Sequence, residues 1–205
     1  MKRNVLWSLL ASALSVALVD PAAHAEGDRE AGKKKFYSCA GCHGIEGYSN
    51  AYPMYHVPRI GGQHADYVVA ALKSYQTGAR KHVGMHGNAS PLSEDDLQDI
   101  AAYVSAFRSI TVNLPVEGNV GAGERKAMEC ASCHGGDGNT EAKSGYPRLA
   151  GQYENYLVKA LRDYKSGARK NAIMGGIAGA LSEQDIENVA AFYASQKKGL
   201  IVVQD

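Results

Sequence analysis

The chain has 205 residues, of which 45% are hydrophobic and 21% charged, and its formal net charge is +1. This length suits one large domain or two small ones. Loss of residues 1–25 would remove Lys2, Arg3 and Asp20 and leave equal numbers of acidic and basic side chains. A neutral chain lacks the basic surface that binding to phosphates requires, so we exclude nucleic acid as a partner.

The first 25 residues predict export. A basic start at Lys2 and Arg3 precedes an apolar run from Val5 to Val19, and the sequence Ala-His-Ala ends at Ala25. This order is typical of a secretory signal peptide. The apolar run is shorter than the about 20 residues that a membrane-spanning helix needs. We therefore expect a cleaved signal peptide at 1–25 and a mature protein that associates with a membrane at most peripherally.

The rest of the chain is a tandem repeat. The segment Gly32–Gly44, GKKKFYSCAGCHG, aligns with Gly123–Gly135, GERKAMECASCHG. The offset between the copies is 91 at the cysteines and 89 from the following prolines onward, so the first copy has two extra residues near Ile45–His56. Self-similarity of this kind indicates duplicated structural units.

The repeat predicts two domains, at residues 26–110 and 121–205. The connecting segment, residues 111–120, contains β-branched residues, a proline and a glycine. That composition favours an extended linker over a helix.

Each copy predicts three helices separated by long loops. The first helices span about 28–39 and about 121–130. The second helices have apolar side chains at i, i+3, i+4 and i+7, on one helical face; in the first copy these are Val68, Ala71, Leu72 and Tyr75. The third helices begin at Ser93 and Ser182, two good N-caps. No strand pattern of useful length is present. Because such small helical domains have marginal cores, we expect a cofactor to fill each one.

Cysteine usage singles out two sites. All four cysteines lie in two Cys-x-x-Cys-His motifs, which are typical of c-type haem attachment. The two thiols would form thioether bonds to the haem vinyl groups, and the histidine would bind the iron from one side. The predicted residues are Cys39, Cys42 and His43 for one haem and Cys130, Cys133 and His134 for the other.

Three other interpretations of the cysteines compete with haem. A zinc site normally pairs such motifs 15–20 residues apart, whereas these lie 91 apart. Redox-active disulfides normally occur in a βαβ setting and do not require the histidine. Structural disulfides are the third alternative. The histidine and glycine after both motifs, in an exported chain, favour haem.

Two matched methionines are the predicted second axial ligands. Met85 and Met174 superpose at the offset of 89, in loops flanked by glycine, whereas Met54 aligns with Lys143. Methionine ligation raises the potential of a haem and suits electron transfer. The roles of three further histidines of the first copy stay open; they are His56, His82 and His86.

With the sequences PRIGGQ and PRLAGQ after the haem-binding loops, the chain resembles the dihaem cytochrome c4 family, the tandem class I cytochromes c of the bacterial periplasm. The resemblance covers Glu26 to about Gln196. It implies an all-α fold of two cytochrome c domains, each about three helices wrapped around a covalently attached haem. It also implies a periplasmic location and a contact between the propionates of the two haems.

The resemblance also assigns structural roles. Gly32 and Gly123 would let the first helix of each domain cross the third closely, against Tyr103 and Phe192. The carbonyls of Pro58 and Pro147 would accept a hydrogen bond from the proximal imidazoles, which fixes the ring and tunes the iron. Arg80 and Arg169 recur near the methionines, and the sequence leaves open whether they are structural or contact a propionate.

Two irons with histidine and methionine ligands leave no open coordination position, so we expect electron transfer and no enzymatic activity. By resemblance, the protein would carry electrons in a respiratory chain, from an upstream donor to a terminal haem-copper oxidase. Two alternatives remain open. One is a dihaem subunit of an oxidoreductase complex, such as a sulfide-oxidising flavocytochrome. The other is a dihaem peroxidase, which would need an exchangeable position on one iron.

Overall fold

The computed structural model describes residues 27–140 and 145–204, so the predicted signal peptide lies outside the described residues. Within these ranges the secondary structure consists of helices and isolated β-bridges, which confirms the predicted all-α fold. No helix in the described part of the chain is long and apolar enough to cross a bilayer.

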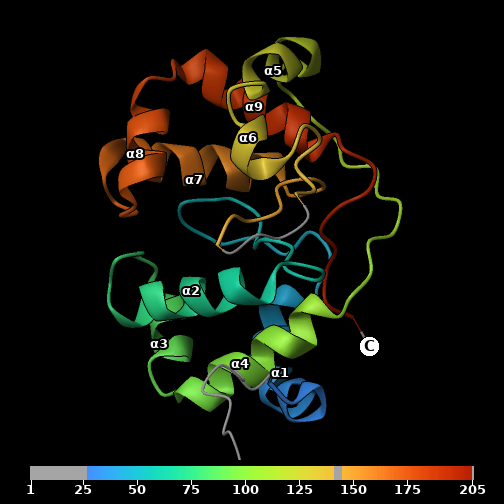
Figure 1. Ribbon diagram of the computed structural model, residues 1–205, viewed down its shortest axis with the longest axis vertical. Helices are drawn as coiled ribbons and strands as arrows, with labels where there is room; N and C mark the ends of the chain where they lie inside the picture. Colours follow the sequence, from blue (N-terminus) through green and yellow to red (C-terminus); the bar gives the residue numbers. More distant parts are fainter. Residues whose placement is uncertain (1–26, 141–144, 205) are drawn as a thin grey trace, which may run out of the picture.

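The described helices fall into two groups, one for each sequence copy (Figure 1). The first group is α1 (Arg29–His43), α2 (Ala65–Gln76), α3 (Val83–Ala89) and α4 (Glu94–Ser105). The second group is α5 (Val120–Ala127), α6 (Ala131–His134), α7 (Glu154–Ser166), α8 (Ala172–Gly179) and α9 (Glu183–Ala194). The three predicted helices of each copy are present. In the second copy the first of them is α5, and the separate short helix α6 lies beyond its predicted end near residue 130. Each copy also has a short helix that the sequence did not predict, α3 or α8.

The first and last helices of each domain cross at a glycine. A Cβ added at Gly32 would lie 1.9 Å from a backbone oxygen of α4 and 2.9 Å from the Cβ of Tyr103. A Cβ added at Gly123 would lie 1.9 Å from a backbone oxygen of α9 and 2.9 Å from the Cβ of Phe192. The close crossings that the resemblance implied are therefore confirmed. They hold the helices that lead into the cysteine motifs.

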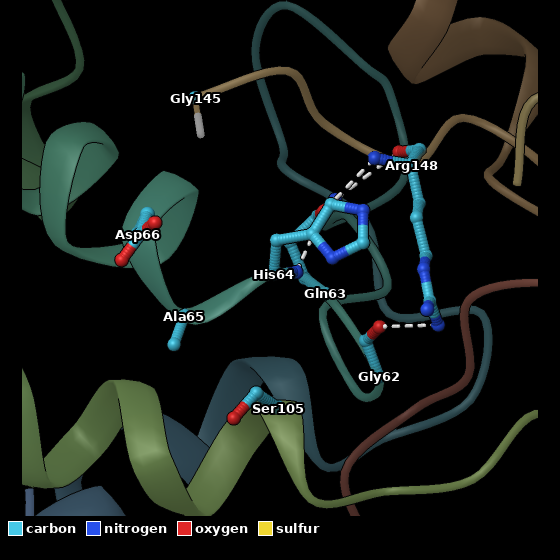
Figure 2. Close-up of a pocket in the computed structure, with 8 residues that line it drawn as sticks. All are labelled: Gly62, Gln63, His64, Ala65, Asp66, Ser105, Gly145 and Arg148. Atoms are coloured by element: carbon cyan, nitrogen blue, oxygen red, sulfur yellow. Dashed lines mark hydrogen bonds between the residues drawn. The ribbon is translucent and has the colours of Figure 1, made fainter. Parts of the chain in front are cut away.

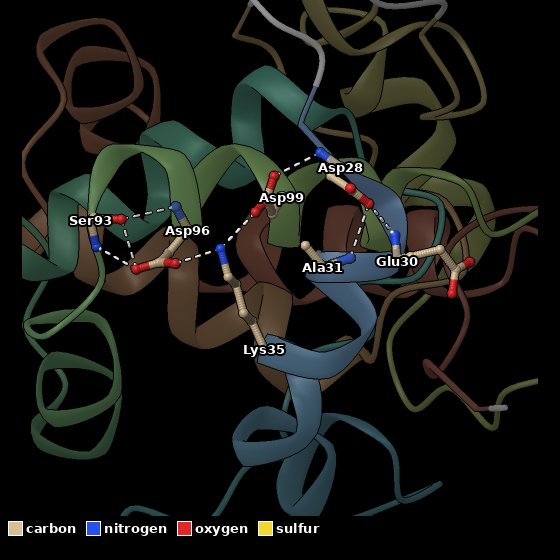
Figure 3. A network of polar contacts seen from close by, with 7 residues as sticks. All are labelled: Asp28, Glu30, Ala31, Lys35, Ser93, Asp96 and Asp99. Carbon is tan, nitrogen blue, oxygen red and sulfur yellow. Dashed lines mark hydrogen bonds and ion pairs between the residues drawn. The ribbon is translucent and has the colours of Figure 1, made fainter.

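A lysine on α1 bridges two carboxylates of α4 (Figure 3). The Nζ atom of Lys35 lies 2.6 Å from an oxygen of Asp96 and 2.6 Å from an oxygen of Asp99. The other oxygen of Asp99 accepts the backbone N–H of Asp28, the N-cap of α1, at 2.6 Å. The second domain has Asn188 in place of Asp99, so this double ion pair belongs to the first domain alone.

The two domains face each other in an approximately twofold arrangement, with α2 of one and α7 of the other on either side of the intervening loops (Figure 1). The segments that follow these helices meet in an antiparallel bridge between Arg80 and Arg169. Arg80 donates to the hydroxyl of Tyr156, and Arg169 donates to the hydroxyl of Tyr67 at 2.6 Å. Each pair is related by the repeat offset of 89, so equivalent residues make equivalent contacts in opposite directions.

The C-terminal tail, residues 199–204, starts on the second domain, where the N–H of Leu200 donates to the carbonyl of Ala150 at 2.8 Å, and continues onto the first (Figure 1). Ile201 exchanges backbone hydrogen bonds of 3.1 and 2.9 Å with Gly61. The N–H of Val203 donates to the carbonyl of His43 at 3.2 Å. Val203 is 3% exposed and lies in the hydrophobic core of the first domain. The core of the first domain is therefore completed by the end of the chain.

The connecting segment runs beside the start of this tail. Thr111 forms an antiparallel bridge with Lys198, and the N–H of Val112 donates to the carbonyl of Lys197 at 2.8 Å. No helix occurs in this segment before α5 begins at Val120. The connecting segment and the tail thus run side by side between the domains.

Candidate haem sites

The first Cys-x-x-Cys-His motif forms the last turn of α1. Cys39 and Cys42 are three residues apart and therefore lie on the same side of the helix. Cys39 is half-buried against the hydrophobic core, Cys42 is exposed, and both are free thiols. His43 is the final helical residue and is buried. The helix thus presents two available thiols next to an imidazole that is turned inward.

The second motif has a helix of its own. Cys130 is the N-cap of the short helix α6, which contains Cys133, and His134 is its last residue. Both cysteines are free thiols. Gly135 follows with a φ of 79°, a left-handed conformation that glycine adopts without strain, and ends the helix. The two motifs therefore reach the same local arrangement from a long helix in one domain and a short one in the other.

Both histidines of the motifs have a fixed ring orientation. The Nδ1 atom of His43 lies 2.9 Å from the carbonyl oxygen of Pro58, and that of His134 lies 2.9 Å from the carbonyl oxygen of Pro147. A carbonyl oxygen can only accept, so Nδ1 carries the proton and the lone pair of Nε2 is left for a metal. Burial lowers the pKa of both histidines, which keeps the rings neutral. The proline contacts that the resemblance implied are present in the structure.

The two methionines occupy short helices, which corrects the expectation of glycine-flanked loops. Met85 lies on α3, and Met174 lies on α8. The backbone N–H of Met85 donates to Nδ1 of His82 at 3.0 Å, and that of Met174 donates to Oδ1 of Asn171 at 2.9 Å. Met85 also packs against the core of the first domain. A side-chain N-cap thus holds the first turn of both helices, and each methionine has a defined position.

The other two undecided histidines of the first domain have partners away from the cysteine motif. His56 stacks on Tyr153 of the second domain with ring centroids 4.6 Å apart. It also lies within hydrogen-bond distance of Asn155 on α7. The Nδ1 atom of His86 lies 2.9 Å from the carbonyl oxygen of Tyr75. These contacts favour structural roles, so Met85 stays the predicted ligand.

Buried and half-buried arginines and tyrosines gather where the two domains meet. This interdomain arginine–tyrosine cluster consists of Arg80, Arg169, Tyr67, Tyr75, Tyr156 and Tyr164. The guanidinium of Arg80 lies 4.6 Å from the ring centre of Tyr75, and that of Arg169 lies 4.5 Å from the ring centre of Tyr164, within the range of a cation–π interaction. Burial opposes the charge, yet the surrounding tyrosines raise the pKa of both arginines. Both therefore stay positively charged.

Two features of the donor set fit a c-type haem in each domain. Among the described residues no carboxylate is bonded to the arginines of the cluster, whereas the nearby Arg59 is ion-paired with Glu46. The buried Nε atoms of Arg59 and Arg148 have no hydrogen-bond partner. Buried positive charge without a carboxylate suits a cofactor that brings its own anionic groups, as the propionates of haem do. In the described ranges, no group of three or more histidine, cysteine or carboxylate side chains gathers as a metal site, so the zinc alternative has no support.

The helical domains and their duplicated motifs define a c-type cytochrome with two tandem haem domains. Comparisons with known proteins agree. The family model of cytochrome c matches residues 29–107 and 121–197. Cytochrome c4 of Stutzerimonas stutzeri is 33% identical over 90% of this chain and 96% of its own. The chain belongs to the cytochrome c4 family, whose cofactors are two covalently bound c-type haems.

Two further comparisons bear on the fold and on partners. The crystal structure of reduced recombinant cytochrome c4 from Pseudomonas stutzeri has a TM-score of 0.69 and 32% identity, and the match covers 83% of this chain and 99% of that chain. A protein of Thiomonas intermedia (strain K12) named thiosulfate dehydrogenase electron acceptor is 42% identical over 78% of both chains. The fold is thus that of cytochrome c4, and the relatives include an acceptor for a dehydrogenase.

Proposed function

We propose that the protein is a periplasmic carrier of two electrons, one per haem, in a respiratory chain. It takes electrons from an upstream donor and passes them to a terminal haem-copper oxidase. The observation that carries this proposal is the matched construction of the two sites, each with a pair of free thiols, a neutral buried histidine and a methionine on a capped helix. The predicted signal peptide supports export.

The residues act in equivalent sets. Cys39 and Cys42, and Cys130 and Cys133, attach the haems through thioether bonds. The residues that would bind the irons are His43 and Met85 in the first domain and His134 and Met174 in the second. Each bound haem supplies reversible one-electron chemistry at a potential that its ligands set.

The polypeptide determines how the sites behave. The carbonyls of Pro58 and Pro147 hold the imidazole rings in one tautomer and one orientation. The caps of α3 and α8 hold the first turns that carry the methionines, which would supply the second ligand of each iron. An iron that His and Met side chains hold from both sides would leave no position for a substrate, and this supports a carrier over a peroxidase.

A second candidate function is favoured by one comparison. The relative from Thiomonas intermedia, an electron acceptor of thiosulfate dehydrogenase by name, spans most of this chain. It supports a role as the partner of a sulfur-oxidising dehydrogenase, the class of complex to which a sulfide-oxidising flavocytochrome also belongs. In that case the upstream donor is a dedicated enzyme that co-purifies with this chain.

The proposed function is tested by counting haems and methionine ligands. We expect two haems per polypeptide and a weak far-red absorption band of the oxidised protein from each of them. Met85→Ala and Met174→Ala should each remove half of that band. Peroxide should leave this band of the oxidised wild type unchanged, and carbon monoxide should leave the spectrum of the reduced wild type unchanged. One haem per chain, or binding of peroxide by the untreated protein, would contradict the closed carrier.

Partners are distinguished by kinetics. Mixing the oxidised protein with a thiosulfate-oxidising dehydrogenase, and the reduced protein with a haem-copper oxidase, measures both half-reactions. Rapid reoxidation by the oxidase with slow reduction by the dehydrogenase supports the first candidate. The reverse result supports the second.

A further inference from the structure

One peptide group in the first domain is bonded at both ends. In the peptide between Pro58 and Arg59, the oxygen accepts from Nδ1 of His43 at 2.9 Å. The N–H of the same peptide donates to Oε1 of Gln152, in the second domain, at 2.9 Å. Nε2 of Gln152 also donates to the carbonyl of Arg59 at 2.8 Å. The proximal histidine of one domain is thus connected through a single peptide to a glutamine of the other.

The second domain repeats this arrangement in the opposite direction. The peptide between Pro147 and Arg148 accepts from Nδ1 of His134 at 2.9 Å and donates to Oε1 of Gln63, in the first domain, at 2.9 Å. Nε2 of Gln63 donates to the carbonyl of Arg148 at 3.1 Å. Figure 2 shows Gln63 and Arg148 joined by these two bonds. Each glutamine therefore holds the backbone beside the other domain's histidine.

The two glutamines are buried and fully engaged. Gln63 is 5% exposed and Gln152 is 4% exposed. Their Oε1 atoms also accept the N–H of the next residue, His64 or Tyr153, at 3.0 Å. Two accepted N–H groups and one donation to a carbonyl leave a single orientation for each amide. Bonds in such a dry setting polarise one another more strongly than bonds in water.

We propose that Gln152 and Gln63 are positioning residues that lower the reduction potential of the haem in the opposite domain. A peptide N–H that donates to a glutamine oxygen places more negative charge on its own carbonyl oxygen. That oxygen then accepts a stronger hydrogen bond from the Nδ1–H of the proximal histidine, which makes the imidazole a more basic ligand. A more basic ligand stabilises the oxidised iron. The inference rests on the proposed function, because it takes His43 and His134 as ligands.

The test uses the full-length dihaem protein with Gln152→Met and Gln63→Met, which keep the side-chain length and remove the hydrogen bonds. Spectroelectrochemical titration gives both potentials of each variant. Met85→His identifies the first haem, because loss of methionine ligation lowers its potential. We expect Gln152→Met to raise the potential of the first haem by about 59 mV, a tenfold change in its one-electron equilibrium. Gln63→Met should raise the potential of the second haem by the same amount.

The control is Asn155→Ala, which removes a contact between α7 and His56 without touching the peptide of Pro58. It should leave both potentials in place. The inference is overturned if each variant shifts the haem of its own domain, if both variants shift both haems equally, or if neither shifts any. Haem content and the far-red bands are measured on the same samples. A wild-type protein without two haems or without both far-red bands would refute the proposed function. Variants that keep the bands but do not shift the potential of the opposite domain's haem would refute the coupling alone.

Discussion

The imidazole of His82 accepts the backbone N–H of Met85 at 3.0 Å and so caps the helix that carries the methionine. In the second domain Asn171 caps the helix of Met174. The same structural task is thus done by an imidazole in one domain and by an amide in the other.

This relationship predicts the outcome of two substitutions at one position. His82→Ala should weaken the first turn of α3 by about 1 kcal/mol, the usual cost of a lost N-cap. The far-red band of the first haem should then disappear at a lower temperature than in the wild type. His82→Asn, which copies the cap of the second domain, should restore the wild-type temperature at which the band disappears. Equal behaviour of the two variants would show that the cap does not hold Met85.

The glycine crossings predict a strong steric effect. Gly32→Ala places a Cβ 1.9 Å from a backbone oxygen of α4, so the two helices must separate. We expect a loss of about 3 kcal/mol in the free energy of unfolding, at the upper end for overpacking. Gly41→Ala is the matched control on the same helix, because no atom lies within 4 Å of its Cβ position. Chemical denaturation followed by circular dichroism measures both, and a mild Gly32→Ala variant would contradict the crossing.

The double ion pair of Lys35 predicts a dependence on pH. The hydrogen bond from Lys35 lowers the pKa of Asp96 to about 2, and a hydrogen bond from the same lysine lowers the pKa of Asp99. An aspartate titrates near about 3.9 in the unfolded chain, so the stabilisation is present above that pH and is lost as the pH falls towards 2. Lys35→Gln should therefore be less stable than the wild type at neutral pH, and the difference should vanish near pH 2.

The matched control for this prediction is Lys126→Gln, at the equivalent position of the second domain, where Asn188 replaces the second carboxylate. Thermal unfolding measured from pH 2 to pH 7 compares the two variants. A difference between Lys35→Gln and the wild type that is independent of pH would mean that packing of the lysine stem, and not its charge, accounts for the effect.

The tail predicts that a residue near the C-terminus stabilises the first domain. Val203→Ala removes two methyl groups from its core, which should cost about 2 kcal/mol. The far-red band of the first haem should be lost earlier on heating, while that of the second haem keeps its midpoint. Gln204→Ala, an exposed neighbour, should change neither midpoint. Equal shifts of both bands would show that the tail belongs to the second domain.

Much of this architecture could be predicted because it repeats. The offset between the copies pairs the two cysteine motifs, the methionines and the crossing glycines, and the apolar spacing of α2 extends over two turns. The helices α3 and α8 escaped prediction for a physical reason. Each is only seven or eight residues long and rich in glycine, so no apolar period can develop. Their N-caps, His82 and Asn171, were the available signal.

Contacts between the domains could not be predicted from one copy at a time. Gln63 and Gln152 occur at matched positions, yet nothing local distinguishes a glutamine that bonds its own domain from one that bonds the other. The end of the tail, from Ile201 to Val203, shows no helix or strand period, and its place on the first domain depends on the three-dimensional arrangement alone. The predicted second domain, residues 121–205, includes the tail because of its position along the chain.

The tail gives the molecule a property that neither domain has by itself. Because the last residues complete the core of the first domain, a cut in the connecting segment near Glu117 would release no free halves. The C-terminal fragment would still hold the N-terminal one through Ile201 and Val203. Expression of the first copy alone would instead leave a gap where Val203 packs. The two domains of the duplicated chain are thus held together by the tail as well as by the connecting segment.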